Sequence, residues 1–308
     1  MAHDHDHHGH QQHGHSHAPA SFGRAFAIGI TLNVALVIGQ IVFGLYAHSV
    51  ALLADAVHNT GDVLGLVFAW GASRLGRLAP TTTRTYGWGR STILAALVNA
   101  IVLLIGTGAI AVEAIQRFWA PQPVANGVVM AVAAFGILLN GGTALMFMRG
   151  RKDDLNIRGA FLHMAGDVAV SFGVVVAALL MQLTGAPWLD PAASLLIGVV
   201  IVAGTWGLLR DATALAMDAV PPGVDAAAVQ RSLAALPGVT EVHDLHIWGL
   251  STTQTAVTAH LVTDGANDRL VPLACAALQD QFAITHCTFQ VETEAVAADC
   301  ALRPDGIV

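Results

Sequence analysis

Residues 49–73 read SVALLADAVHNTGDVLGLVFAWGAS, an apolar segment that contains three ionisable side chains, Asp55, His58 and Asp62. The segment exceeds the ~20 apolar residues that a helix needs to cross the hydrocarbon core of a bilayer. An ionisable side chain at that depth is unfavourable unless it has a partner or a function. The segment therefore predicts a transmembrane helix that carries a functional site.

The apolar character extends over most of the chain. Hydrophobic residues make up 55% of the 308 residues and charged residues only 11%, and the mean hydropathy is +0.61. A soluble protein of this size needs more charge at its surface. Six segments have the length and apolarity of membrane-spanning helices: 25–47, 49–73, 91–115, 124–148, 159–183 and 191–209. We predict an integral membrane protein with a six-helix transmembrane domain over residues 24–210.

Basic residues indicate which ends of the spans face the cytoplasm. They gather after the second and fourth predicted spans, whereas the connections after the first, third and fifth contain only Arg117. Cytoplasmic connections are enriched in Lys and Arg, so both termini are expected in the cytoplasm. The expected location is a bacterial inner membrane. The sparse set Cys275, Cys287 and Cys300 makes no disulfide framework and fits a reducing compartment.

Residues 211–308 have the composition of a soluble domain. Their patterns predict helices over 225–236 and 267–282 and strands over 240–250, 254–262 and 285–292. The order α-β-β-α-β indicates a small α+β domain of the ferredoxin type. Twelve acidic residues against three arginines argue against binding to nucleic acid or to an anionic membrane surface.

The second and fifth predicted spans each carry a histidine followed four residues later by an aspartate. These pairs are His58 with Asp62 and His163 with Asp167. Residues four apart lie on one face of a helix, one turn from each other, so each span offers one nitrogen and one carboxylate ligand. Two such faces would form a four-ligand N₂O₂ site, which suits the tetrahedral preference of zinc. Asp55 lies on the same stripe and is expected as an outer partner or a proton relay, with a simple polar contact as the alternative.

Transport explains why such ligands are placed inside the membrane, whereas a structural zinc site does not. Histidine and aspartate bind a metal ion only when deprotonated. Protons can therefore replace the ion on the more acidic side. The sequence predicts exchange of a divalent metal ion for protons, with the metal as substrate and without a catalytic cofactor.

The first residues of the chain are rich in histidine. Residues 1–23 have a composition that cannot bury a core, so we expect a disordered cytoplasmic tail. Imidazoles at this density collect divalent ions weakly. The tail histidines are His3, His5, His7, His8, His10, His13, His15 and His17.

These features together resemble the cation diffusion facilitator family, and specifically its zinc-transporting branch. The resemblance also rests on Tyr86-Gly-Trp-Gly-Arg90, Asp190-Pro191 and Val242-His-Asp-Leu-His-Ile-Trp248. It implies a homodimer, alternating access with proton exchange, and a ferredoxin-like cytoplasmic domain that binds metal and strengthens dimerisation. Manganese-type relatives have Asp at the position of His58, so His58 favours zinc, with cobalt and cadmium as companions.

The resemblance also implies a metal site in the cytoplasmic domain, with zinc as a regulatory ligand. The family's metal positions correspond to His243, His260 and Glu292, with His286 next to them. Two of these residues lie on neighbouring predicted strands and the others on a third strand. Cys300 stands alone where some relatives carry a pair of cysteines, which argues against a thiolate ligand there.

Two other functions compete with transport at this stage. A buried zinc ion can also activate water in an intramembrane metalloenzyme, but the chain has no HExxH motif. A membrane-tethered metal sensor would leave the ionisable residues of the second and fifth spans unexplained. The ranking of zinc against cobalt, cadmium and nickel stays open, because their affinities for such ligands overlap.

Overall fold

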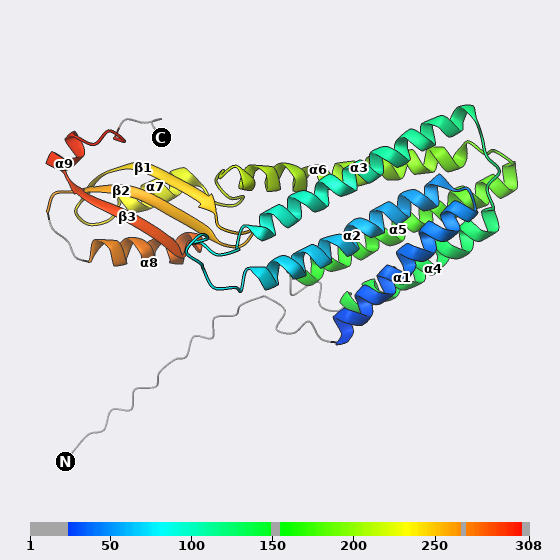
Figure 1. Cartoon of the computed structure of the whole chain (residues 1–308), viewed down its shortest axis with the longest axis horizontal. Helices are drawn as coiled ribbons and strands as arrows, with labels where there is room; N and C mark the ends of the chain where they lie inside the picture. The colour runs from blue at the N-terminus through cyan, green and yellow to red at the C-terminus, as the bar shows by residue number, and fades with distance from the viewer. Residues whose placement is uncertain (1–23, 149–154, 266–268, 304–308) are drawn as a thin grey trace, which may run out of the picture.

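The computed structural model describes residues 24–148, 155–265 and 269–303 (Figure 1). Six long helices come first: α1 (Arg24–Tyr46), α2 (Val50–Leu75), α3 (Ser91–Trp119), α4 (Asn126–Phe147), α5 (Leu155–Thr184) and α6 (Leu189–Ala216). The six predicted spans coincide with these helices. Helix α6 continues past residue 210, so the boundary predicted between the two domains lies inside a helix; the domain limits themselves stay a prediction.

Five of these helices, α2 to α6, are long and apolar enough to cross a membrane. In the described part of α1 the apolar segment, Ile30–Tyr46, is shorter. Large apolar side chains cover the outside of the bundle; Leu138 and Leu183, for example, are each 73% exposed. Such a surface is unfavourable in water and suits contact with lipid.

Helix α2 lies at the centre of the bundle, in contact with α1, α3, α5 and α6. Its start is held by the first turn of α6. Asp190 accepts hydrogen bonds from Ser49 Oγ at 2.5 Å and from the backbone amides of Val50 at 2.7 Å and Ala51 at 3.4 Å. The first amides of a helix have no partner within the helix, and an anion there is also favoured by the helix dipole. Asp190 is buried and so fixes α2 relative to α6.

The cytoplasmic domain follows α6 at one end of the bundle (Figure 1). Its described elements are α7 (Ala226–Ala234), β1 (Val239–Gly249), β2 (Thr255–Thr263), α8 (Leu270–Phe282), β3 (His286–Thr293) and α9 (Glu294–Ala298). In the described part of the chain, the sheet has the order β1-β2-β3, with β1 and β2 antiparallel and β2 and β3 parallel. The predicted helices and strands match these elements, except that α9 was not predicted.

Helices α7 and α8 pack on one face of this sheet. Val229 and Leu233 of α7 and Leu270 and Leu278 of α8 are fully buried against Leu261 of β2. The parallel pairing of β2 with β3 requires a crossover, and α8 supplies it. The result is the α+β domain that the sequence predicts. The face of the sheet opposite to α7 and α8 carries the polar residues described below.

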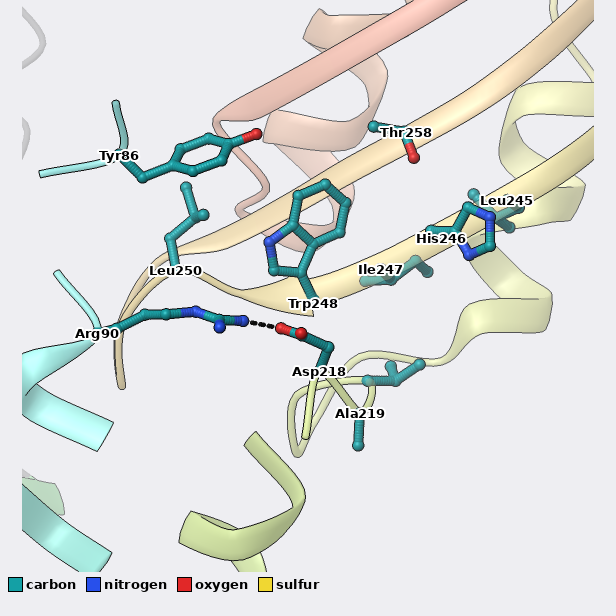
Figure 2. A pocket seen from close by; sticks show the side chains of 11 residues that line it. Tyr86, Arg90, Asp218, Ala219, Leu245, His246, Ile247, Trp248, Leu250 and Thr258 are labelled. Atoms are coloured by element: carbon teal, nitrogen blue, oxygen red, sulfur yellow. Dashed lines mark ion pairs between the residues drawn. The ribbon is translucent and has the colours of Figure 1, made fainter. Parts of the chain in front are cut away.

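The loop between α2 and α3 contacts the cytoplasmic domain and the segment that leads into it (Figure 2). Arg90 forms an ion pair with Asp218, which follows α6, and both residues line a pocket with Trp248 of β1. A Cβ atom at Gly89 would lie 2.8 Å from the carbonyl oxygen of Leu250, so only glycine allows this approach. The Tyr86-Gly-Trp-Gly-Arg90 motif is therefore a contact between the two parts of the protein.

Replacing Asp190 by Ala should destabilise the protein, because it leaves buried donors at the start of α2 without an acceptor. Each lost bond to a charged group contributes about 1–3 kcal/mol, and we expect a clearly lower unfolding temperature in detergent. The control is Asp211→Ala, since Asp211 pairs with its exposed neighbour Arg210 at 3.0 Å and surface pairs contribute about 0–1 kcal/mol. Equal unfolding temperatures for the two variants would contradict the role given to Asp190.

Candidate metal centres

The ionisable residues of α2 and α5 meet inside the helix bundle. His58 Nε2 lies 2.9 Å from Asp167 Oδ1, and His163 Nε2 lies 3.4 Å from Asp62 Oδ1. Each histidine thus faces a carboxylate of the other helix, although His163 is also 3.9 Å from Asp167 Oδ2 on its own helix. Ligand atoms of His58, Asp62 and Asp167 all lie within 4.8 Å of one another. The structure therefore brings the four predicted ligands together.

The exposure of these ligands changes along the helices. The side chain of Asp167 is 3% exposed, whereas that of His163 is 46% exposed and that of Asp62 is 28% exposed. Asp62 and His163 are the ligands nearer the ends of α2 and α5 that adjoin the cytoplasmic domain (Figure 1). The exposure of the ligands therefore increases from Asp167 towards the helix ends that adjoin the cytoplasmic domain.

Asp55 takes part in a buried network beside this site. Its Oδ2 accepts hydrogen bonds from Gln40 Nε2 at 2.7 Å and from Ser171 Oγ at 3.0 Å. Gln40 in turn accepts one from Asn59 Nδ2 at 3.0 Å. The network links α1, α2 and α5 on the side of the site away from the cytoplasmic domain. Sequence reasoning selected Asp55 but missed Gln40 and Ser171, because uncharged polar residues are common in membrane helices.

The four ligands suit a divalent ion that accepts both nitrogen and oxygen. Two imidazoles and two carboxylates provide an N₂O₂ set, which matches the coordination number and ligand types of zinc. Magnesium and calcium prefer sites built from oxygen alone. The pairs His58–Asp167 and His163–Asp62 also satisfy the charged groups when no ion is bound, which a buried charge requires.

A second group of ligands lies on the sheet of the cytoplasmic domain. His243 and His260 are paired directly across β1 and β2, with ring centroids 5.0 Å apart. Glu292 of β3 places Oε1 at 3.0 Å from His260 Nδ1 and Oε2 at 3.6 Å from His243 Nε2. His243 and Glu292 are buried, with side chains 3% and 1% exposed. These three predicted ligands are close enough to share an ion.

Further carboxylates lie near the two histidines on the opposite side. A register shift in β1 follows His243, and Asp244 has a positive φ of 50°. This bulge brings Asp244 Oδ2 to 3.6 Å from His260 Nε2. Glu241 Oε1 lies 3.5 Å from His243 Nδ1, and the Arg303 guanidinium holds the pKa of the Glu241 carboxyl below its ordinary value. Outer carboxylates of this kind orient metal-binding histidines.

His286 does not belong to this group, so the prediction that placed it there is wrong. It pairs with Ala256 at the start of β3, whereas Glu292 pairs with Val262 near the other end. Six residues of a strand cover about 20 Å at ~3.3 Å per residue. The ring of His286 instead packs edge-on against Tyr86, with centroids 5.5 Å apart. The pattern identified the correct strand and face but not the distance along the strand.

Cys300 takes the place beside the cluster that was expected for His286. Its Sγ lies 3.7 Å from His260 Nδ1, and the ligand atoms of His243, His260, Glu292 and Cys300 all lie within 4.8 Å of one another. Sequence reasoning argued against this cysteine because it is single. Helix α9, which was not predicted, returns the chain to the sheet and brings Cys300 there. The tail histidines, His3 to His17, lie outside the described residues.

The family of the chain follows from comparison with known proteins. The profile of the cation efflux transmembrane domain matches residues 26–215. This chain belongs to the cation efflux family. The profile of the cation efflux protein cytoplasmic domain matches residues 221–294. The resemblance drawn from the sequence motifs is confirmed.

Relatives in the cation efflux family match over nearly the whole chain. The zinc transporter ZitB of Escherichia coli is 36% identical over 283 residues, covering 90% of each chain. The metal cation efflux system protein CzcD of Cupriavidus metallidurans is 34% identical over 277 residues, covering 89% of this chain and 88% of that one. The cadmium, cobalt and zinc/H(+)-K(+) antiporter of Bacillus subtilis is 30% identical over 286 residues, covering 91% and 92%. This cation efflux protein is therefore an integral membrane transporter and not an enzyme.

The cytoplasmic cluster allows a test with a matched pair of histidine variants. In full-length protein carrying Asp167→Ala, which weakens the membrane site, His243→Ala should lower the affinity for zinc by at least about tenfold, because even outer partners of a metal contribute that much. His286→Ala should leave the affinity unchanged. Calorimetric titration of the purified protein measures both, and equal losses in the two variants would contradict the separation of His286 from the cluster.

Proposed function

We propose that this cation efflux protein exports divalent metal ions, zinc above all, from the cytoplasm in exchange for protons. The observation that carries the proposal is the reciprocal arrangement of His58 with Asp167 and of His163 with Asp62 between α2 and α5. A site formed by two helices changes its geometry when the helices shift relative to each other. Binding and release of an ion can thus be linked to alternating access.

Exchange for protons follows from the chemistry of the same four groups. They coordinate a metal ion only when deprotonated, and they form His–Asp pairs when the ion is absent. A protonated histidine beside a carboxylate keeps the pair neutral, as a bound divalent ion does for two carboxylates. Protons and metal ion therefore compete for one site. The name of the Bacillus subtilis relative, a zinc/H(+)-K(+) antiporter, supports this reading.

The shape of the site supports uptake of the ion from the cytoplasmic side. His163 and Asp62 are partly exposed on that side, while the network of Gln40, Asp55 and Ser171 closes the opposite side. We assign Asp55 to this outer barrier, as a partner near the ligands or a relay for the exchanged protons. Release to the outside would then require α1, α2 and α5 to separate at this network.

Zinc is the ion that the ligand set favours, and cobalt and cadmium are proposed as further transported ions. The nitrogen of His58 is a softer ligand than a carboxylate oxygen and disfavours manganese. The printed names of relatives include a zinc transporter and an antiporter for cadmium, cobalt and zinc. The histidines of the N-terminal tail would collect such ions near the cytoplasmic opening.

We further propose a homodimer in a bacterial inner membrane, with six spans and both termini in the cytoplasm. The six-span assignment includes α1, and it keeps the predicted limits of 24–210 for the transmembrane domain and 211–308 for the cytoplasmic domain. We assign the latter to the ferredoxin type, and we propose that zinc bound at His243, His260 and Glu292 regulates transport. The sheet order and the crossover through α8 support the assignment of the domain to the ferredoxin type.

Flux measurements test the transport site directly. Asp167→Ala and His163→Ala should each reduce zinc uptake into proteoliposomes with an acidic lumen by more than about tenfold, since each removes one of four ligands. Uptake by the unaltered protein should raise the luminal pH. The control is Phe172→Ala, an exposed residue of α5 that faces away from the site. Full zinc flux through Asp167→Ala would overturn the proposal.

A change of ligand type tests the selectivity. His58→Asp replaces a nitrogen ligand by an oxygen ligand and should shift the preference from zinc towards manganese. Competition between the two ions in the same flux assay measures the shift. An unchanged order of ions, with transport retained, would remove His58 from the direct ligands.

A further inference from the structure

We propose that Cys300 is the fourth ligand of the cytoplasmic metal site, which makes it a sulfur-containing site formed within one chain. The inference deepens the proposed function, because it rests on metal binding by His243, His260 and Glu292. It assigns to the site a chemistry different from that of the membrane site: one thiolate, one carboxylate and two imidazoles, in place of two carboxylates and two imidazoles.

The first support is geometric. Cys300 Sγ and His260 Nδ1 are 3.7 Å apart, which is within reach of a weak sulfur hydrogen bond and also matches two atoms that ligate one ion. The same nitrogen is 3.0 Å from Glu292 Oε1. One ligand atom from each of the four residues lies within 4.8 Å of the others. Ligands at about 2.0–2.3 Å from a zinc ion are separated from one another by such distances.

The second support comes from buried polar atoms that lack partners. Neither ring nitrogen of His243 nor Oε2 of Glu292 has a hydrogen-bond partner among the described residues, although both side chains are almost fully buried. A buried acceptor without a partner is unfavourable by about 1–3 kcal/mol. His243 Nε2 and Glu292 Oε2 face each other at 3.6 Å, so one bound cation would satisfy both.

The charges of the four ligands also favour a divalent ion. On binding, the thiol of Cys300 loses its proton to water, while both histidines bind as neutral rings. Glu292 and the Cys300 thiolate then contribute two negative charges, which balance the two positive charges of the ion. Without the thiolate, Glu292 would be the one charged ligand, and the remaining positive charge would be balanced only by the outer carboxylates Glu241 and Asp244.

The other two cysteines are not suited to this role. Burial, together with the neighbouring Cys275, raises the pKa of the Cys287 thiol to about 12. Cys287 also packs with the apolar core beneath the sheet, on the face covered by α7 and α8. Cys300 is instead reached from a pocket that it lines together with His243 and Arg303. An ion can therefore approach this sulfur from solvent.

A thiolate ligand has consequences for selectivity and for the C-terminal segment. Soft ions such as zinc and cadmium bind sulfur well, whereas manganese and magnesium do not. The site would therefore respond to the ions that the transporter exports. Cys300 follows α9, and Arg303 binds Glu241 through two hydrogen bonds of 3.1 and 2.8 Å. Metal binding would thus hold α9 and residues 299–303 on the sheet.

Cadmium absorption tests the sulfur ligand in the full-length protein. Thiolate bound to cadmium gives a charge-transfer absorption in the ultraviolet, whereas the membrane site contains no sulfur. Titration of the reduced, metal-free protein in detergent with cadmium chloride should produce this absorption and saturate at one equivalent of thiolate-bound cadmium per chain. Cys300→Ser should abolish it and weaken cadmium binding by at least about tenfold. The Cys275→Ser/Cys287→Ser double variant should retain it.

The outcomes separate this proposal from the proposed transport function. Absorption that persists in Cys300→Ser, or that is absent from the double variant in which Cys300 is the only cysteine, overturns the role of Cys300. The second result does not depend on the folding of Cys300→Ser. Asp167→Ala should lose zinc flux and keep the cadmium absorption. If the absorption depends on Cys300 while no variant affects flux, the transport site fails and the sulfur ligand stands.

Discussion

A charged side chain inside a bilayer must have a partner, and this constraint governs the arrangement of α2 and α5. Their histidines and aspartates pair between the helices, His58 with Asp167 and His163 with Asp62. Each pair stabilises the two helices against each other while no ion is bound. In the proposed transport cycle the same atoms become metal ligands when protons are lost. The requirement for pairing and the capacity to bind a metal ion therefore arise from one set of residues.

The two candidate metal centres use similar ligands but are formed by different structural rules. In the membrane, the ligands of each helix are four residues apart and lie on one helix face. In the cytoplasmic domain, His243 and His260 become neighbours through strand pairing, and a bulge at Asp244 adds an outer carboxylate. The helical site can change when helices move, whereas the sheet site is fixed by backbone hydrogen bonds. This difference suits a transported ion at the first site and a retained ion at the second.

Helix α2 connects the features on which the proposed transport depends. Asp190 holds its first turn against α6, and Asp55 joins its middle to α1 and α5. Its last turn leads into the loop in which Arg90 forms an ion pair with Asp218, close to β1 of the cytoplasmic domain. The cytoplasmic domain is therefore in contact with the loop that follows the helix carrying His58 and Asp62.

The sequence by itself determined the positions of the helices and strands other than α9, and the two His–Asp pairs of α2 and α5. These depend on local properties: the length of apolar segments, a period of two or 3.6 residues, and a spacing of four. Only the tertiary structure decided that each histidine faces the other helix, that Gln40 and Ser171 bind Asp55, and that Cys300 lies beside His260. Those contacts depend on the register and packing of segments distant in the chain, which no local pattern encodes.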